Sequence, residues 1–147
     1  MSCKIFLSMS LCVAAFCCGC TKPVERPEDL PELFATEIKV NSHAGPVVDA
    51  KVTLVPADDA TPKWPNGGTT NKQGIAFLKT LDQFTGVPEG QYKVLIEKTE
   101  GTSPMFDLVD PKFKNDKTTP HQVEVMRQKL NSPPPVDVGA PVRVEIK

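Results

Sequence analysis

Apolar and polar residues alternate in several short segments between residues 33 and 147. The clearest is 91–98, QYKVLIEK, where Tyr92, Val94 and Ile96 fall on one side and mostly charged residues on the other. Side chains two positions apart share one face of a β-strand, so this pattern predicts a half-buried strand with these three residues in the core. No segment keeps the 3.6-residue apolar period of a helix.

Four further segments show the same two-residue period. It places on the inward face Phe34, Thr36, Ile38 and Val40; Ala50, Val52 and Leu54; Val123 and Val125; and Val142, Val144 and Ile146. A shorter strand at 75–78 follows a turn at Gly74 and is expected to supply Ile75, Phe77 and Leu78 as apolar contacts. The two longest intervening stretches, 57–71 and 101–119, are predicted loops, the second with room for one short edge strand.

These segments predict an all-β fold. Six or seven short strands separated by turns favour an antiparallel β-sandwich of about seven strands over alternating strands and helices. The chain contains 15 prolines, which argues against long helices. A closed barrel is the alternative, because alternation does not determine how sheets close.

The first 19 residues have the layout of a secretory signal peptide. Lys4 precedes a mainly apolar run at 5–16, and small residues follow. A signal core needs about 7–15 apolar residues and a membrane-spanning helix roughly 20, so this run predicts export and cleavage. Gly19 and Cys20 resemble the lipobox of bacterial lipoproteins, although Cys17 and Cys18 stand where an aliphatic and a small residue are commoner.

Cys20 is therefore the predicted lipidation site and the membrane attachment point. The predicted domains are a signal peptide at 1–19, a lipidated cysteine with a proline-rich stalk at 20–32, and a β-sandwich at 33–147. Residues 21–32, if fully extended, would span roughly 37 Å at ~3.1 Å per residue. The residue after Cys20 is Thr21 and not the aspartate associated with inner-membrane retention, so the outer membrane is favoured if the cell has one.

Composition limits the chemistry of the mature chain. All five cysteines lie at or before Cys20, so no internal disulfide and no thiolate metal site is expected beyond it. Cleavage removes one lysine and no acidic residue, which moves the net charge from −1 to about −2. A slightly acidic chain is not expected to bind nucleic acid, because such binding needs a clustered basic face.

A set of turn and strand residues resembles a known family. The pattern G-P-V-x-x-A-x-V-x-L-V-P at 45–56, the turn at Gly74, and G-x-P-x-G-x-Y-x-V at 86–94 are similar to carboxypeptidase-regulatory-like, transthyretin-like domains. The resemblance covers roughly residues 33–147 and implies a Greek-key, prealbumin- or immunoglobulin-like sandwich without enzymatic activity. It implies structural roles only, with Gly45, Gly74 and Gly90 in turns and Ala50 and Tyr92 in the core.

Few residues suggest chemistry. Trp64, the only tryptophan, lies between Pro62 and Pro65, where it would either stack on a sugar or partner side chain or cover one end of the core. His43 and His121, about 80 residues apart, are expected to be exposed loop residues rather than zinc ligands. A cation in the 107–116 loop, on Asp107, Asp110, Asn115 and Asp116, is the weaker interpretation, because their spacing matches no EF-hand.

The sequence therefore predicts a membrane-anchored, non-enzymatic lipoprotein of the cell surface or periplasm. Its expected partners are the membrane, through Cys20, and an envelope protein or glycan, with no cofactor and no metal. The alternative is a carbohydrate-binding module that uses loop aromatics, with Trp64 as the contact residue.

Overall fold

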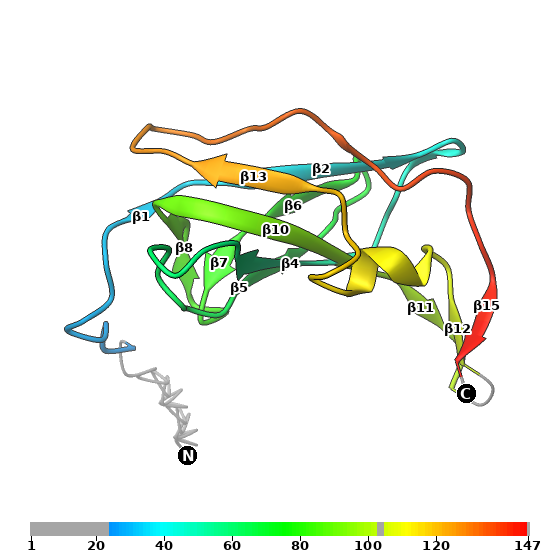
Figure 1. The fold of residues 1–147 in the computed structure, drawn as a ribbon, viewed down its shortest axis with the longest axis horizontal. Coiled ribbons are helices and arrows are strands. Elements are labelled where there is room, and N and C mark those ends of the chain that lie inside the picture. The colour runs from blue at the N-terminus through cyan, green and yellow to red at the C-terminus, as the bar shows by residue number, and fades with distance from the viewer. Residues whose placement is uncertain (1–23, 103–104, 147) are drawn as a thin grey trace, which may run out of the picture.

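The fold is described by a computed structural model for residues 24–102 and 105–146, and it is all-β (Figure 1). Its strands are β1 (Leu33–Phe34), β2 (Glu37–Ser42), β3 (Gly45–Pro46), β4 (Lys51–Pro56), β5 (Asn66–Thr69), β6 (Ile75–Phe77), β7 (Lys79–Thr80), β8 (Phe84–Thr85), β9 (Val87–Pro88), β10 (Gly90–Glu97), β11 (Thr99–Glu100), β12 (Met105–Asp107), β13 (Gln122–Val125), β14 (Val136–Asp137) and β15 (Val144–Ile146). A single 3₁₀ helix in the described residues, η1, spans Pro111–Lys114. The β-sandwich is confirmed, but its strand segments outnumber the predicted seven, because several are two-residue pairings.

The larger sheet has the order β13-β10-β4-β5-β7-β8 and is antiparallel. Its centre is the pairing of β10 with β4, in which Val94 lies opposite Leu54 and Ile96 opposite Val52. Tyr92, Val94 and Ile96 are each at most 1% exposed. The predicted inward face of 91–98 is thus confirmed.

The second sheet is built around β2, whose Ile38 and Val40 are fully buried. β2 pairs antiparallel with β3 and β6, and parallel with β14. The predicted inward residues of the 33–40, 49–55 and 121–128 segments are buried, apart from Phe34, which is half-buried against the core.

The chain changes sheets at Leu78, since β6 pairs with β2 and β7 pairs with β5. Ala76 and Leu78 point into the core, whereas Phe77 is 59% exposed. The expected apolar contact of Leu78 is confirmed, that of Phe77 is wrong, and Ile75 is half-buried. Both possible faces of this short strand carry apolar residues, so alternation could not select between them.

The predicted 57–71 loop contains a strand, β5, which is a second correction. Glycine disfavours strands, but here close backbone approach requires it. A Cβ on Gly68 would lie 2.7 Å from the Phe77 carbonyl oxygen, and one on Gly67 would lie 2.9 Å from that of Val52. These glycines let β5 lie between β4 and β7.

The C-terminal strand does not join the core. β15 pairs with β12 in a separate three-stranded sheet with β11, at the end of the molecule opposite β1 (Figure 1). Val144 and Ile146 are 43% and 37% exposed, so their predicted inward orientation is wrong. Phe113, which lies in the charged run 112–117, is buried instead.

Tyr92 makes the contact that marks many Greek-key sandwiches. Its hydroxyl donates to the carbonyl oxygen of Pro88, four residues earlier, at 2.9 Å. This is the geometry of a tyrosine corner, in which a strand-entry tyrosine bonds back to the preceding turn. Burial raises the pKa of Tyr92 to about 12, so the buried hydroxyl stays protonated as a donor.

The N-terminal segment is less extended than predicted. Leu30 is buried, its amide donates to the Pro27 carbonyl, and the Arg26 guanidinium donates to the carbonyls of Leu30 and Pro31 at 3.3 and 2.7 Å. Residues 26–31 therefore form a local turn. The signal peptide and Cys20 lie outside the described residues, within which no helix is long and apolar enough to cross a membrane.

Candidate functional site

A groove of about 720 Å³ lies beside Trp64, on the outer face of the larger sheet. We call it the Trp64 groove; the lining residues that matter here are Lys51, Thr53, Val55, Asp58, Asp59, Lys63, Trp64, Gly67 and Asp82. Lys51, Thr53 and Val55 alternate with the buried residues of β4 and so form the outward side of that strand. Gly67, opposite Thr53 on β5, adds no side chain to this floor.

Trp64 is half-buried along one side of this groove. It is not part of the core cluster, so the interpretation of the indole as a lid over the core is not what the structure describes. It is also not fully exposed. The half-buried side chain thus lines the groove, which suits stacking against a flat apolar ligand surface.

Buried polar side chains fix the backbone at Trp64. The Asn66 amide nitrogen donates to the Trp64 carbonyl at 2.8 Å, and the Asn66 carbonyl oxygen accepts from the Thr80 hydroxyl at 2.7 Å. Both Asn66 and Thr80 are buried. The amide of Leu81 also donates to the Pro65 carbonyl at 2.9 Å. The loop carrying Trp64 is thus tied to β7 and its following turn.

The other wall of the groove is held by Asp58 and Thr61. One Asp58 carboxylate oxygen accepts from the amide and the hydroxyl of Thr61, each at 2.8 Å. The hydrogen bond from the Thr61 hydroxyl, followed by that from its amide, lowers the pKa of Asp58. The Thr61 hydroxyl accepts in turn from the Gln91 amide at 2.9 Å, which fastens the wall to β10.

Charges of both signs border the groove. Lys63 pairs with Asp59 at 3.0 Å, and both side chains are largely exposed, so this contact contributes little to stability. Lys51 and Asp82 are exposed at the rim. Asp82 has a left-handed backbone (φ 58°), as Leu81 does, which marks a tight turn after β7. The groove thus offers an aromatic side, hydrogen-bond acceptors and a free ammonium group.

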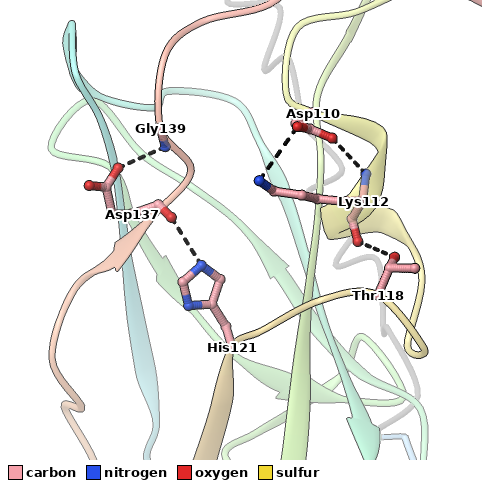
Figure 2. A network of polar contacts seen from close by, with 6 residues as sticks. All are labelled: Asp110, Lys112, Thr118, His121, Asp137 and Gly139. Carbon is pink, nitrogen blue, oxygen red and sulfur yellow. Dashed lines mark hydrogen bonds and ion pairs between the residues drawn. The ribbon is translucent and has the colours of Figure 1, made fainter.

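The two histidines are not brought into one ligand set. His43 is exposed, as expected, but His121 is half-buried. Its ring stacks on Phe113, with centroids 5.4 Å apart, and its Nε2 lies 3.0 Å from the Asp137 carbonyl oxygen (Figure 2). His121 precedes β13 of one sheet and Asp137 lies in β14 of the other. The contact therefore links the two sheets, and the expectation of an exposed loop residue is wrong for His121.

Asp107, Asp110 and Asn115 of the 107–116 loop have other partners. Asp107 is buried, and its two carboxylate oxygens accept hydrogen bonds from the Lys114 ammonium group at 2.9 and 3.1 Å. This contact raises the pKa of Lys114. Asp110 accepts from the Lys112 amide at the start of η1 (Figure 2). Asn115 accepts from the Lys117 amide. Among the described residues, no group of three or more His, Cys, Asp or Glu side chains is placed to hold a metal.

Sequence reasoning found Trp64 but not its supports. Asp58 and Thr61 have the spacing of a residue whose side chain caps a turn three residues later, so their contact had a local signal. Asn66 and Thr80 had none, because 14 residues separate them and their pairing depends on the β5–β7 register. Comparison with protein-family models, curated proteins and solved structures finds no match for this chain.

Proposed function

We propose that this chain is a membrane-anchored, non-enzymatic binding module of a bacterial cell envelope, similar to transthyretin-like domains. The signal layout at 1–19 and Cys20 support the anchor and an extracytoplasmic, preferably outer-membrane, location. The β-sandwich and the tyrosine corner at Tyr92 support the resemblance.

The Trp64 groove is the observation that carries the binding role. Its aromatic wall is fixed through Asn66 and its polar wall through Thr61, so a ligand would meet a site already formed. The Asp58 carboxylate keeps its charge because two donors from Thr61 stabilise it. A carboxylate held ionised in this way serves as a hydrogen-bond acceptor rather than as a proton donor to a substrate.

An envelope protein and a glycan are the two occupants that this groove suits. The glycan is favoured by a specific combination, a half-buried indole beside carboxylates that can accept from sugar hydroxyls. A protein partner would place an aromatic or aliphatic side chain against the same indole. Both readings make Trp64 the contact residue.

The anchor is tested on the mature protein. Mass spectrometry of chain purified from membranes should find an acylated N-terminal Cys20. Two or more acyl chains hold a protein stably, since each buried CH₂ contributes about 0.8 kcal/mol. A Cys20→Ala chain should accordingly leave the detergent phase. An unmodified cysteine, or unchanged partitioning of the alanine chain, would contradict the anchor.

The groove is tested through its single tryptophan. Titration with cell-wall glycan fragments should change Trp64 emission. Trp64→Ala should remove capture of glycan fragments, and separately of solubilised envelope proteins, in a pull-down, which needs no tryptophan signal. Phe77→Ala is the matched control, because Phe77 is 59% exposed on the other sheet. Glycan binding that is lost in Trp64→Ala but kept in Phe77→Ala supports a glycan as the ligand. Binding of envelope proteins alone supports a protein partner. Binding that is equal in both variants would remove the groove from the proposal.

A further inference from the structure

The turn that follows β13 presents two large apolar side chains to solvent. In the 126–130 loop, Met126 and Leu130 are each 48% exposed, and they flank Arg127 and Lys129. Scattered apolar residues are normal on a surface, but here two occupy the ends of one five-residue turn with cationic residues between them. The loop therefore has the composition of an interfacial contact, with apolar tips and basic neighbours.

This loop is fixed from below by Asn131, which is 2% exposed. The Asn131 side-chain oxygen accepts from the Met126 amide at 3.0 Å and from the Gln128 side chain at 2.8 Å, while its amide nitrogen donates to the Met126 carbonyl at 3.1 Å. The Asn131 backbone amide donates to the Ala35 carbonyl at 2.8 Å. These contacts hold the turn in one shape and attach it to the segment that leads into β2.

The loop lies at the end of the sandwich where the N-terminal segment enters. Arg127, Gln128 and Lys129 line one hollow together with Glu32, Leu33, Phe34 and Ala35. Arg127 also pairs with Glu89 at 2.6 Å, next to β9, the partner strand of β1. Figure 1 shows the turn after β13 near β1, far from β15 at the other end of the molecule.

The spacer between this end and the proposed anchor is short. Because Arg26 donates to the carbonyls of Leu30 and Pro31, residues 26–31 are folded locally and do not add their full extended length to the connection. The connection between the anchor and β1 is therefore shorter than the roughly 37 Å that residues 21–32 would span if fully extended. The end of the sandwich that carries the 126–130 loop is thus kept close to the lipid surface.

We infer that the 126–130 loop rests on the bilayer that carries the Cys20 anchor, with Met126 and Leu130 entering the headgroup region. Lys129 has its ammonium group available for anionic headgroups, and its alkyl stem can lie along the surface. The Trp64 groove, on the outer face of the larger sheet, would then be held at a defined orientation to the membrane. This inference depends on the proposed lipid anchor.

The test uses the full acylated chain in vesicles of phosphatidylethanolamine and phosphatidylglycerol. Two variants are made in a Trp64→Phe background, Leu130→Trp in the loop and Val144→Trp at the opposite end of the sandwich. With brominated acyl chains in the vesicles, the L130W indole should lose about half or more of its emission and shift to the blue, because it enters the acyl boundary. The V144W indole should keep its emission.

Each outcome decides between the possibilities. Equal quenching of the two indoles, or no quenching at position 130, would overturn the inference. A blue-shifted L130W indole that brominated lipid does not quench would also overturn it, because protein rather than lipid would then cover the loop. Mass spectrometry of the same sample separates this failure from that of the anchor, because an unacylated chain refutes the anchor itself. Met126→Trp repeats the measurement if Leu130→Trp does not fold.

Discussion

Replacing Tyr92 by phenylalanine tests whether the tyrosine corner stabilises the sandwich. The ring is fully buried and its hydroxyl donates to the Pro88 carbonyl at 2.9 Å. Phenylalanine keeps the ring but leaves this carbonyl without its donor. Loss of one partner from a buried hydrogen bond costs about 1–2 kcal/mol, so the melting temperature should fall by roughly 3–8 °C for a domain of this size.

At high pH the stability difference between the two proteins should change in the opposite direction. Burial raises the pKa of Tyr92 to about 12 from an ordinary 10.0, so the folded state binds this proton more tightly than the unfolded state. The contribution is fully present below pH 10 and is lost as the pH rises towards about 12, by about 3 kcal/mol in all. The Tyr92→Phe protein lacks this loss, so its disadvantage should shrink and then reverse in strong alkali.

Denaturant unfolding of both proteins at neutral pH and at about pH 11.5 measures the difference, in which the titration of lysines shared by both proteins cancels. The ultraviolet absorbance of tyrosinate reports this one residue, because the chain has a single tyrosine. Equal stability at neutral pH would refute the corner. A stability difference that stays constant into strong alkali would refute the buried, protonated hydroxyl.

Two further predictions concern β10 and the groove wall. Val94→Ala should destabilise the fold by about 2–3 kcal/mol, because it opens a cavity in the core. Lys93→Ala should change the free energy of unfolding little in the same denaturant titration. Equal effects would mean that the two faces of β10 are assigned wrongly. Gly90→Ala would place a Cβ 2.6 Å from the methyl carbon of Thr61, so it should displace the polar wall that Thr61 holds and weaken glycan binding to the Trp64 groove. Unchanged binding would show that Thr61 does not position that wall.

The sequence predicts the centre of this fold well. In β2, β4, β10 and β13 one face is apolar and the other is mostly charged or polar, so the two-residue period favours one orientation. The all-β class follows from these strands alone. Phe113 shows the opposite case, since its neighbours are charged and no period marks it as a buried residue.

Elements whose burial is set by distant partners could not be predicted. β5 is Gly-rich and lies in register between β4 and β7, which no local pattern records. β15 has the alternation of a core strand, but it pairs with β12 beyond the core, and both of its apolar residues remain exposed. Alternation reports that a strand has two faces, but it does not report what covers either of them.

The candidate site divides in the same way. Trp64 was recognisable because it is the only tryptophan and lies between two prolines. The contacts that hold its backbone were not, because they come from Asn66 and Thr80, which lie on two adjacent strands. His121 was misjudged for a similar reason, since its partners Phe113 and Asp137 come from η1 and β14.

Thr61 connects the stretch around Gly90 with one wall of the Trp64 groove. Gly90 belongs to the G-x-Y pattern that resembles the transthyretin-like family, and at this position the lack of a Cβ makes room for Thr61. Thr61 is buried and bonded both to Asp58 in the groove and to the Gln91 amide in β10. Two residues further along the strand, Tyr92 closes the corner. A stretch with structural roles in a turn and in the core thus also supports one wall of the groove, so changes in this short stretch would alter stability and binding together.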